Sequence, residues 1–526
     1  MTEGAARFVR TNRSRAIPTP WRIGLAAIVG GVMCAVLAPL VYVVFAVFGN
    51  IEGSLETLFR ADVWRLVWRT VLLALCVTAS ALALATGLAW VIARRPVPGG
   101  RAWLIPLSLP LAAPSFLVAE AHHRALGFDG FVGAWLSITL ITYPLALLPL
   151  EATLRRVSRD AEHAARCFGC TGWQAFRKAT LPQIMPTLEW TGLLIALYAL
   201  SDYGAPAMLR IQVLTTAIES RRMFDPAGVA VLSLLLCAMA MACIVGIGRI
   251  RSTRWWIAPS AHVEIRCDEC TRLRGAGAVM GTLLCAGTFA MGVGVPASMV
   301  LLWWIKAGEA ADTSMLGALR IAGPGASRSL GVAIATTAIA CVLAVPFLML
   351  GLRSPDAQRG SRTTRLSTLT LVGYAMPGVV VGFALVSIGL RTPLLYQTLP
   401  LLLMGYLVRS MAETLGPASA AARRLPHERL DAARGLGASY ATTWRRIGLP
   451  AVAPGLIAGG ALTFLTVVKE LPVTLILRPT GFDTLAFELF DSLKEAMHTR
   501  AAPMAVVLLL VSGLVVGALV ASDKDD

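Results

Sequence analysis

The 526-residue chain has little charge, because only 15% of its residues are Asp, Glu, Lys or Arg, whereas 56% are hydrophobic. This composition excludes an ordinary soluble protein. Several apolar runs reach about 20 residues, the length at which a helix crosses a bilayer. The alternating segments of about ten residues that build an outer-membrane barrel are missing. The sequence therefore predicts an all-α integral membrane protein that crosses the membrane many times.

Nucleotide-binding and catalytic motifs are missing as well. A P-loop needs Gly-Lys followed by Ser or Thr, and no lysine of this sequence is followed by either residue. No His-Glu-x-x-His motif is present. Connectors between apolar runs do not exceed about 35 residues, too few for a folded domain. ATP hydrolysis by P-loop machinery is excluded, while a membrane enzyme whose catalytic residues converge from distant positions stays open as an alternative.

The net charge of +17 comes without the basic domain that nucleic-acid binding needs. With the N-terminus inside, about 32 of the 47 Lys and Arg residues lie in cytoplasmic segments, as the positive-inside rule expects. The first apolar run is too long for a signal peptide and indicates a first transmembrane helix. We therefore predict that both termini are cytoplasmic.

Twelve membrane spans are predicted from the apolar runs. The third and fourth spans of the second half, 367–390 and 393–411, are separated by the shortest connector. The spans cover residues 23–48, 68–93, 102–121, 131–151, 187–207, 227–248, 276–304, 329–352, 367–390, 393–411, 452–472 and 502–521. Six of them fall in each half of the chain.

The chain repeats itself at an offset of 268 residues. Two polar, arginine-rich stretches, His163–Pro182 and Asp431–Pro450, lie at this offset and interrupt the apolar sequence. Identical residues continue beyond the stretches into the following span. We predict two tandem halves, 1–258 and 259–526, related by a pseudo-two-fold axis along the membrane normal, with a pathway at their interface.

Both polar stretches have the composition of two short helices joined by a turn. Ala-Ala-Arg favours a helix, and the glycine that follows it permits a tight turn with positive φ. Pro182 and Pro450 suit the first turn of the next helix. We expect each stretch to lie along the membrane with one face free to dock a partner, rather than to serve only as a connector.

Ten cysteines are present, most of them inside apolar runs, where they act as small apolar residues. Two C-x-x-C pairs remain, Cys167/Cys170 and Cys267/Cys270, and four thiolates can hold zinc. The second copy of the repeat has no cysteine where the first pair stands. Chance occurrence is therefore the favoured interpretation, and no metal site is predicted.

The second polar stretch resembles the EAA motif of ABC importer permeases: Glu-Ala-Ala, three residues, Gly, nine residues, Ile, any residue, Leu-Pro. The residues that carry the resemblance are Asp431, Ala432, Ala433, Gly437, Ile447, Leu449 and Pro450. The first stretch keeps Ala164, Ala165, Gly169, Leu181 and Pro182. It departs at the acidic position, where His163 stands with Glu162 one residue early, and Ala179 replaces Ile.

This resemblance implies the type I ABC importer permease fold and a set of partners. In the family, each such loop inserts into one subunit of a separate ATPase dimer. Two loops in one chain then imply two copies of a cytoplasmic ABC ATPase, which bind the ATP and Mg, so that no cofactor is expected in this chain. A periplasmic or lipid-anchored solute-binding protein and membrane lipid are the other expected partners. The implied location is the cell inner membrane, and Asp431 is expected to matter more than His163.

The substrate is indicated by the segment from Lys469 to Pro479, which resembles the corresponding part of fused, twelve-span iron(III) permeases. The stretch Ser201-Asp202-Tyr203-Gly204 is similarly related to that family. The Lys-Glu-Leu-Pro part is shared with thiamine, phosphonate and polyamine permeases, which remain alternatives. The expected function is import of ferric iron by alternating access, and an ATPase-independent secondary transporter is the less favoured reading.

Three charged residues at matching span ends, Asp202, Lys469 and Glu470, are candidates for the pathway, because charge at membrane depth faces a partner or an aqueous cavity. The alternative is that Lys469 and Glu470 neutralise each other or lie at the external interface. His122 and His123, near an external helix end, are expected at the interface rather than as metal ligands.

Overall fold

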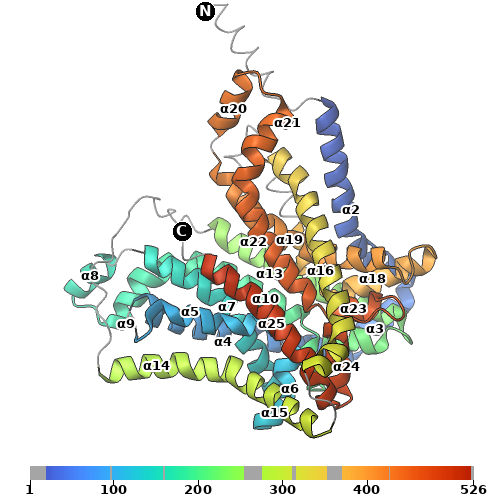
Figure 1. Ribbon diagram of the computed structural model, residues 1–526, viewed down its shortest axis with the longest axis horizontal. Coiled ribbons are helices and arrows are strands. Elements are labelled where there is room, and N and C mark those ends of the chain that lie inside the picture. The colour runs from blue at the N-terminus through green and yellow to red at the C-terminus, as the bar shows by residue number, and fades with distance from the viewer. Residues whose placement is uncertain are drawn as a thin grey trace, which may run out of the picture. The chain divides into compact units, whose positions relative to one another are not determined.

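The computed structural model describes residues 19–94, 97–157, 160–253, 275–310, 315–351, 370–425 and 427–522. Every regular element in these ranges is a helix (Figure 1). The expected all-α fold class is therefore confirmed. The chain separates into two compact units, unit 1 (Met1–Tyr42 and Arg328–Phe482) and unit 2 (Val43–Ser327 and Asp483–Asp526).

Each unit contains segments of both predicted halves. Unit 1 holds α2 (Thr19–Gly49) as far as Tyr42, α16 (Met315–Gly351) from Arg328, α18 (Gly378–Arg391), α19 (Leu399–Arg424), α20 (His427–Gly435), α21 (Tyr440–Thr443), η5 (Trp444–Gly448), α22 (Leu449–Val468) and α23 (Pro472–Leu477). Unit 2 holds the remaining parts of α2 and α16, and α3 (Ile51–Phe59), α4 (Ala61–Ala93), η1 (Gly100–Trp103), α5 (Leu104–Ser108), η2 (Leu109–Ala112), α6 (Ser115–Leu126), α7 (Gly130–Arg156), α8 (Asp160–Cys167), α9 (Gly172–Ala175), η3 (Phe176–Thr180), α10 (Leu181–Ser201), α11 (Gly204–Met208), α12 (Leu214–Arg221), α13 (Pro226–Thr253), α14 (Ala276–Phe289), η4 (Ala290–Gly294), α15 (Val295–Ala310), α24 (Leu485–Lys494) and α25 (His498–Ser522). The join between the predicted halves lies in residues 254–274, outside the described ranges, so the division at residue 258 stays a prediction.

Within the described residues, nine helices are long and apolar enough to cross a membrane, or ten if one bent pair is a single span. The nine correspond to nine of the twelve predicted spans. The count of twelve is not confirmed. The three exceptions are the predicted spans 102–121, 367–390 and 393–411.

The predicted span 102–121 is broken by a bend of 98° between Gly100–Ala112 and Ser115–Leu126. Ala113, at the break, has an extended backbone with φ −85° and ψ 138°. Pro114 follows it, and a proline disfavours helical geometry in the residue before it. Proline also lacks the N–H that would continue the helical ladder. The apolar run was therefore correctly found, but it does not form one straight helix.

The predicted pair 367–390 and 393–411 differs from the structure in helix length and ends. α18 begins only after the extended Pro377 and has 14 residues, which are too few to span a bilayer as a helix. α19 begins at Leu399 and continues to Arg424, well past the predicted end at residue 411. It carries Arg409 and Glu413 in its interior and is not among the nine apolar helices.

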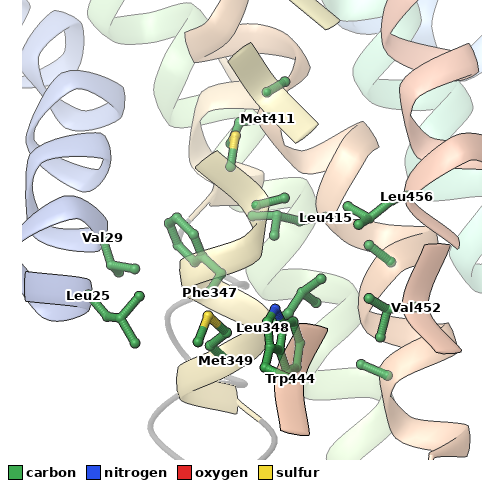
Figure 2. Close-up of a cluster of buried hydrophobic side chains, with 14 of the residues drawn as sticks. Leu25, Val29, Phe347, Leu348, Met349, Met411, Leu415, Trp444, Val452 and Leu456 are labelled. Carbon is green, nitrogen blue, oxygen red and sulfur yellow. The ribbon is translucent and has the colours of Figure 1, made fainter. Parts of the chain in front are cut away.

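The core of unit 1 packs the end of the second polar stretch against the long helices. Its buried side chains come from α2, α16, α19, α22 and η5 (Figure 2). They include Leu25, Phe347, Leu415, Val452 and Trp444. Because Trp444 belongs to this cluster, the end of the second polar stretch is packed into the same core as the membrane helices.

α19 and α22 pack closely because α22 carries a Gly-x-x-x-Gly pair, Gly455 and Gly459. Small residues at this spacing let two helix backbones approach in a membrane. A Cβ on Gly459 would lie 2.5 Å from the backbone oxygen of Thr414, and one on Gly455 would lie 2.6 Å from that of Pro417. These neighbours are backbone atoms, which cannot turn aside as a side chain does.

We therefore expect Gly459→Leu to destabilise unit 1 by about 1–3 kcal/mol or more, since an inserted side chain in a packed helix interface forces backbone shifts. Thermal unfolding of the purified protein in detergent, followed by intrinsic fluorescence, measures the effect. Gly416→Leu on α19 is the matched control, because a Cβ at Gly416 meets no atom within 4 Å. Equal unfolding temperatures for the two variants would contradict the close packing of α19 and α22.

Candidate functional site

The first polar stretch folds as the two short helices that its composition predicts. α8 ends at Cys167, and the chain turns at Gly169, whose φ is 82°. α9 then begins after Thr171, whose hydroxyl accepts the N–H of Gln174 at 3.3 Å, while the Gln174 side chain accepts the N–H of Thr171 at 3.0 Å. This reciprocal capping box fixes the start of α9.

The second polar stretch has the same design. α20 ends at Gly435, the turn lies at Gly437 with φ 89°, and the Ser439 hydroxyl accepts the N–H of Thr442 at 3.2 Å at the start of α21. In both stretches a π-helical turn follows, η3 in the first and η5 in the second. Pro182 and Pro450 then lie in the first turn of α10 and α22, as expected.

Both turns close with the same pair of backbone hydrogen bonds. In the first, Gly169 N–H donates to Arg166 O at 3.0 Å and Cys170 N–H donates to Ala165 O at 3.1 Å. In the second, the equivalent bonds run from Gly437 to Arg434 and from Ala438 to Ala433, at 3.0 and 3.1 Å. This is the Schellman arrangement, which requires a left-handed residue after the helix end and so favours glycine.

An aromatic residue anchors each stretch to its unit. In unit 2, Phe176 of η3 meets the ring of Trp90 on α4 edge-on, with centroids 5.0 Å apart. In unit 1, the equivalent residue Trp444 is buried in the core, and Tyr440 OH donates to Met349 O of α16 at 3.5 Å. Each stretch is therefore coupled mechanically to the long helix that it packs against.

Each turn also presents one apolar side chain to solvent. Phe168 is 88% exposed and Leu436 is 90% exposed, and both directly precede the turn glycine. We define Phe168 and Leu436 as the loop-tip residues. They were not among the predicted site residues, although an apolar residue before the glycine in both copies is a signal that the sequence contains. A single exposed apolar side chain is ordinary, but its recurrence at the equivalent place of both copies makes Phe168 and Leu436 candidates for docking.

The two stretches differ at the acidic position, as the sequence indicates. Glu162 is paired within its own helix, 2.9 Å from Arg166, and His163 is exposed. In the second stretch Asp431 is partly buried, and Arg434 lies over the ring of Tyr440 at 5.8 Å. The other predicted residues of these stretches lie on the same helices and turns.

The cysteines of the first stretch flank its turn glycine. Cys167 ends α8 and is exposed, and Cys170 takes part in the turn hydrogen bonds; both are free thiols. Cys267 and Cys270 lie outside the described residues. A zinc site made of the two pairs is therefore not tested.

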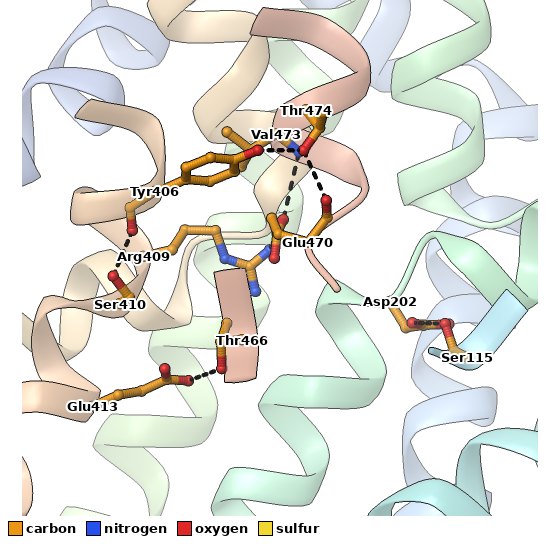
Figure 3. A network of polar contacts seen from close by, with 10 residues as sticks. All are labelled: Ser115, Asp202, Tyr406, Arg409, Ser410, Glu413, Thr466, Glu470, Val473 and Thr474. Atoms are coloured by element: carbon orange, nitrogen blue, oxygen red, sulfur yellow. Dashed lines mark hydrogen bonds and ion pairs between the residues drawn. The ribbon is translucent and has the colours of Figure 1, made fainter. Parts of the chain in front are cut away.

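In unit 2, Asp202 follows α10 and caps the short helix α11. Its Oδ2 accepts the N–H of Ala205 at 3.1 Å, and its Oδ1 accepts the hydroxyl of Ser115 at 2.6 Å. Figure 3 draws the second of these bonds. Asp202 thus joins the end of α10 to the start of α6, immediately after the bend in the predicted span 102–121.

In unit 1, Glu470 has the corresponding place after α22, and it caps α23. Its Oε1 accepts the N–H of Val473 at 3.5 Å and pairs with Nη1 of Arg409 on α19 at 3.1 Å (Figure 3). The side chains of Arg409 and Glu470 are 15% and 9% exposed. Arg409 was missed by sequence reasoning, because it lies 61 positions away from Glu470. The partly buried Lys469 is thus not the partner that forms this ion pair.

His122 is buried inside unit 2, which the sequence did not predict. It is 1% exposed, its Nδ1 lies 3.2 Å from the Ser137 hydroxyl, and its Nε2 lies 2.9 Å from Met291 O. The bend in the chain before α6 turns this helix into the interior of unit 2, which a straight span would not do. His123, by contrast, is partly exposed and contacts Asp129.

The arrangement is suited to moving helices rather than to bond chemistry. Each unit has one anchored, exposed loop before a long helix, α10 or α22, and an acidic residue, Asp202 or Glu470, follows that helix. Interrupted membrane helices are typical of transport pathways, where the freed backbone groups line a polar cavity.

Comparisons with known proteins are consistent with this. The family described as "Binding-protein-dependent transport system inner membrane component" matches residues 348–522. The chain is 28% identical over 516 residues to the Fe(3+)-transport system permease protein FbpB 2 of Haemophilus influenzae, covering 94% of this chain and 97% of the relative. It is 25% identical to the sulfate transport system permease protein CysW of Escherichia coli, over 39% of this chain and 77% of the relative. The molybdenum transport system permease protein ModB of Escherichia coli is 29% identical over 26% of this chain and 69% of its own length.

Proposed function

Since this chain belongs to the family of binding-protein-dependent ABC importer permeases, we propose that it imports ferric iron across the inner membrane. It is the multi-pass transport subunit, and ATP hydrolysis belongs to a separate ATPase subunit. Membership of the family also implies a substrate-binding protein as partner. The nucleotide and Mg are bound by the ATPase, and this chain needs no cofactor of its own.

The observation that carries the iron assignment is the extent of one match. Similarity to the Fe(3+) permease extends over 94% of this chain, so it includes both polar stretches and both helix breaks. Similarity to the sulfate permease extends over only 39%. A single chain with two coupling loops is thus matched as a whole by the iron permease.

The two polar stretches are the coupling surfaces of the proposed transporter. Each inserts its loop-tip residue, Phe168 or Leu436, into one of two copies of a cytoplasmic ATPase. Both termini are then cytoplasmic, and the binding protein, periplasmic or lipid-anchored, delivers solute to the opposite side. Because Asp431 stands at the acidic position of the motif, where the first loop has His163, Asp431 contributes more to docking than His163.

Transport proceeds by alternating access. Closure of the ATPase dimer moves both loops, and the aromatic anchors Phe176 and Trp444 transmit the movement to the long helices that they contact. The two halves then rock, so that the pathway opens outward to receive solute and inward to release it. Asp202 and Glu470 hold the short helices at the breaks during this movement.

Uptake of radiolabelled iron(III) tests the substrate. Under iron limitation, iron uptake by cells that lack this chain is expected to be at least tenfold lower than in wild-type cells. A plasmid copy should restore it. Sulfate, molybdate, thiamine and a phosphonate are measured beside iron. Unchanged iron uptake in cells without a second iron importer would contradict the assignment.

An oxyanion is the second candidate, favoured by the partial matches to sulfate and molybdenum permeases. Loss of sulfate or molybdate uptake, with iron uptake retained, would establish this candidate instead.

A further inference from the structure

Unit 1 contains a buried polar network that no predicted site residue except Glu470 belongs to. It is built from Arg409 and Glu413, which lie one helical turn apart on the same face of α19, and from Thr466 and Glu470 at the end of α22 (Figure 3). Charged groups buried between the helices of a membrane protein are costly and often mark a functional site. The network therefore needs a functional explanation.

Glu413 is the incompletely satisfied member of this network. One of its oxygens, Oε1, accepts the hydroxyl of Thr466 at 3.0 Å. The other, Oε2, is buried and has no hydrogen-bond partner among the residues that the structure describes. A native protein rarely leaves a buried carboxylate oxygen unpaired, and such an atom points to a water, an ion or a moving partner.

Arg409 already has a carboxylate partner, Glu470. Its Nη1 forms the ion pair with Glu470, although its Nε has no partner. The charge of Arg409 is thus already matched by a carboxylate, whereas the hydrogen bond to Glu413 comes from a neutral hydroxyl. Arg409, Lys469 and Glu470 all lie near enough to act on the charge of Glu413. Glu413 therefore keeps one carboxyl oxygen open, and carboxyl oxygens are the ligands that hard cations prefer.

The fold does not need these charges. At the positions 268 residues earlier, unit 2 has Ile141, Leu145 and Tyr198 in place of Arg409, Glu413 and Thr466. Ile141 and Tyr198 belong to one hydrophobic cluster there. The same α-helical arrangement is therefore built once with apolar residues and once with charged ones, so the arrangement by itself does not require a carboxyl group at the position of Glu413.

We propose that Glu413 is the specificity-determining carboxylate of the translocation pathway, which takes a cationic solute at its open oxygen while the Arg409–Glu470 pair holds α19 against the helix break. This rests on the proposed import of iron. Gly378 supports the arrangement, because a Cβ there would meet both Arg409 and Glu470.

The test compares Glu413→Gln with the wild-type chain, assembled with its ATPase and binding protein in proteoliposomes. Glutamine has the same shape but no charge, so it keeps the bond to Thr466 and removes the attraction for a cation. We expect radiolabelled iron(III) uptake to fall at least tenfold while ATP hydrolysis by the assembled transporter stays within about twofold, and Glu413→Asp to recover part of the uptake. Glu52→Gln, the same change at an exposed position on α3, is the control.

Three outcomes overturn the proposal, each in a different way. Wild-type uptake by Glu413→Gln excludes a role in selecting the solute. A parallel loss of uptake and ATP hydrolysis shows that Glu413 is structural. If the wild-type chain carries an oxyanion and no iron, the proposed function fails and the cation site fails with it, whereas the first two outcomes leave iron import intact.

Discussion

Replacing Gly437 by Val is expected to abolish association with the ATPase and to lower uptake at least tenfold, while the chain still inserts in the membrane. Gly437 has φ 89°, a conformation that a β-branched residue adopts only with strain. A Cβ at this position meets no atom within 4 Å. The effect therefore comes from the backbone conformation and not from a clash, at a cost of about 1–3 kcal/mol.

The strain is confined to the turn, because only the turn joins the short helices α20 and α21. Loss of the left-handed residue removes the two Schellman hydrogen bonds and changes the direction in which Leu436 projects. Co-purification of the tagged chain with its ATPase, together with solute uptake, measures the result. Gly435→Val is the matched control: the residue ends α20, has no positive φ, and has open space for a Cβ. Normal uptake with Gly437→Val would refute the docking role of this loop.

Replacing Arg409 by Leu is expected to destabilise unit 1 by about 3–5 kcal/mol, because it leaves the buried carboxylate of Glu470 without its partner. The bond between Glu470 and Val473 N–H is long, at 3.5 Å, and compensates little. The unfolding temperature of the purified protein in detergent should fall accordingly. Arg424→Leu, the same change at the exposed end of α19, should leave it nearly unchanged.

The double variant Arg409→Leu with Glu470→Leu distinguishes the contribution of the ion pair from that of its surroundings. Replacing both members of a buried ion pair by apolar residues is often close to neutral. We therefore expect the double variant to recover most of the stability that the single variant loses. If the single and double variants unfold at the same temperature, the ion pair is not what holds the helix break to α19.

The coupling loops show how far a repeated local pattern can be read. A helix-forming Ala-Ala-Arg, a glycine at the turn and a proline in the first turn of the next helix predict the two stretches, and the structure has Gly169 and Gly437 in the left-handed region. The direction of the side chains beside each glycine is not local information. Phe168 and Leu436 are exposed because the anchors Phe176 and Trp444 hold the other face of each loop against the long helices.

The charged residues at the helix breaks show what a local sequence pattern cannot predict. Asp202 and Glu470 are recognisable as equivalent positions of the repeat, and both cap the short helix that follows. Their other partners, Ser115 and Arg409, lie on different helices and differ in chemistry. No spacing rule connects residues so far apart, and so the sequence alone offered only the adjacent Lys469 as an alternative partner for Glu470.

By itself the sequence determined what depends on composition and short spacing: the all-α membrane fold, nine apolar spans, the two repeated loops and the resemblance to importer permeases. Long apolar runs and turn glycines act locally, so they can be read without knowing their neighbours. Only the tertiary structure decided the bend before α6, the burial of His122, the extent of α19 and the network around Glu413. Each of these depends on which distant segments pack together, since a buried polar group is stable only where another element of the fold supplies its partner.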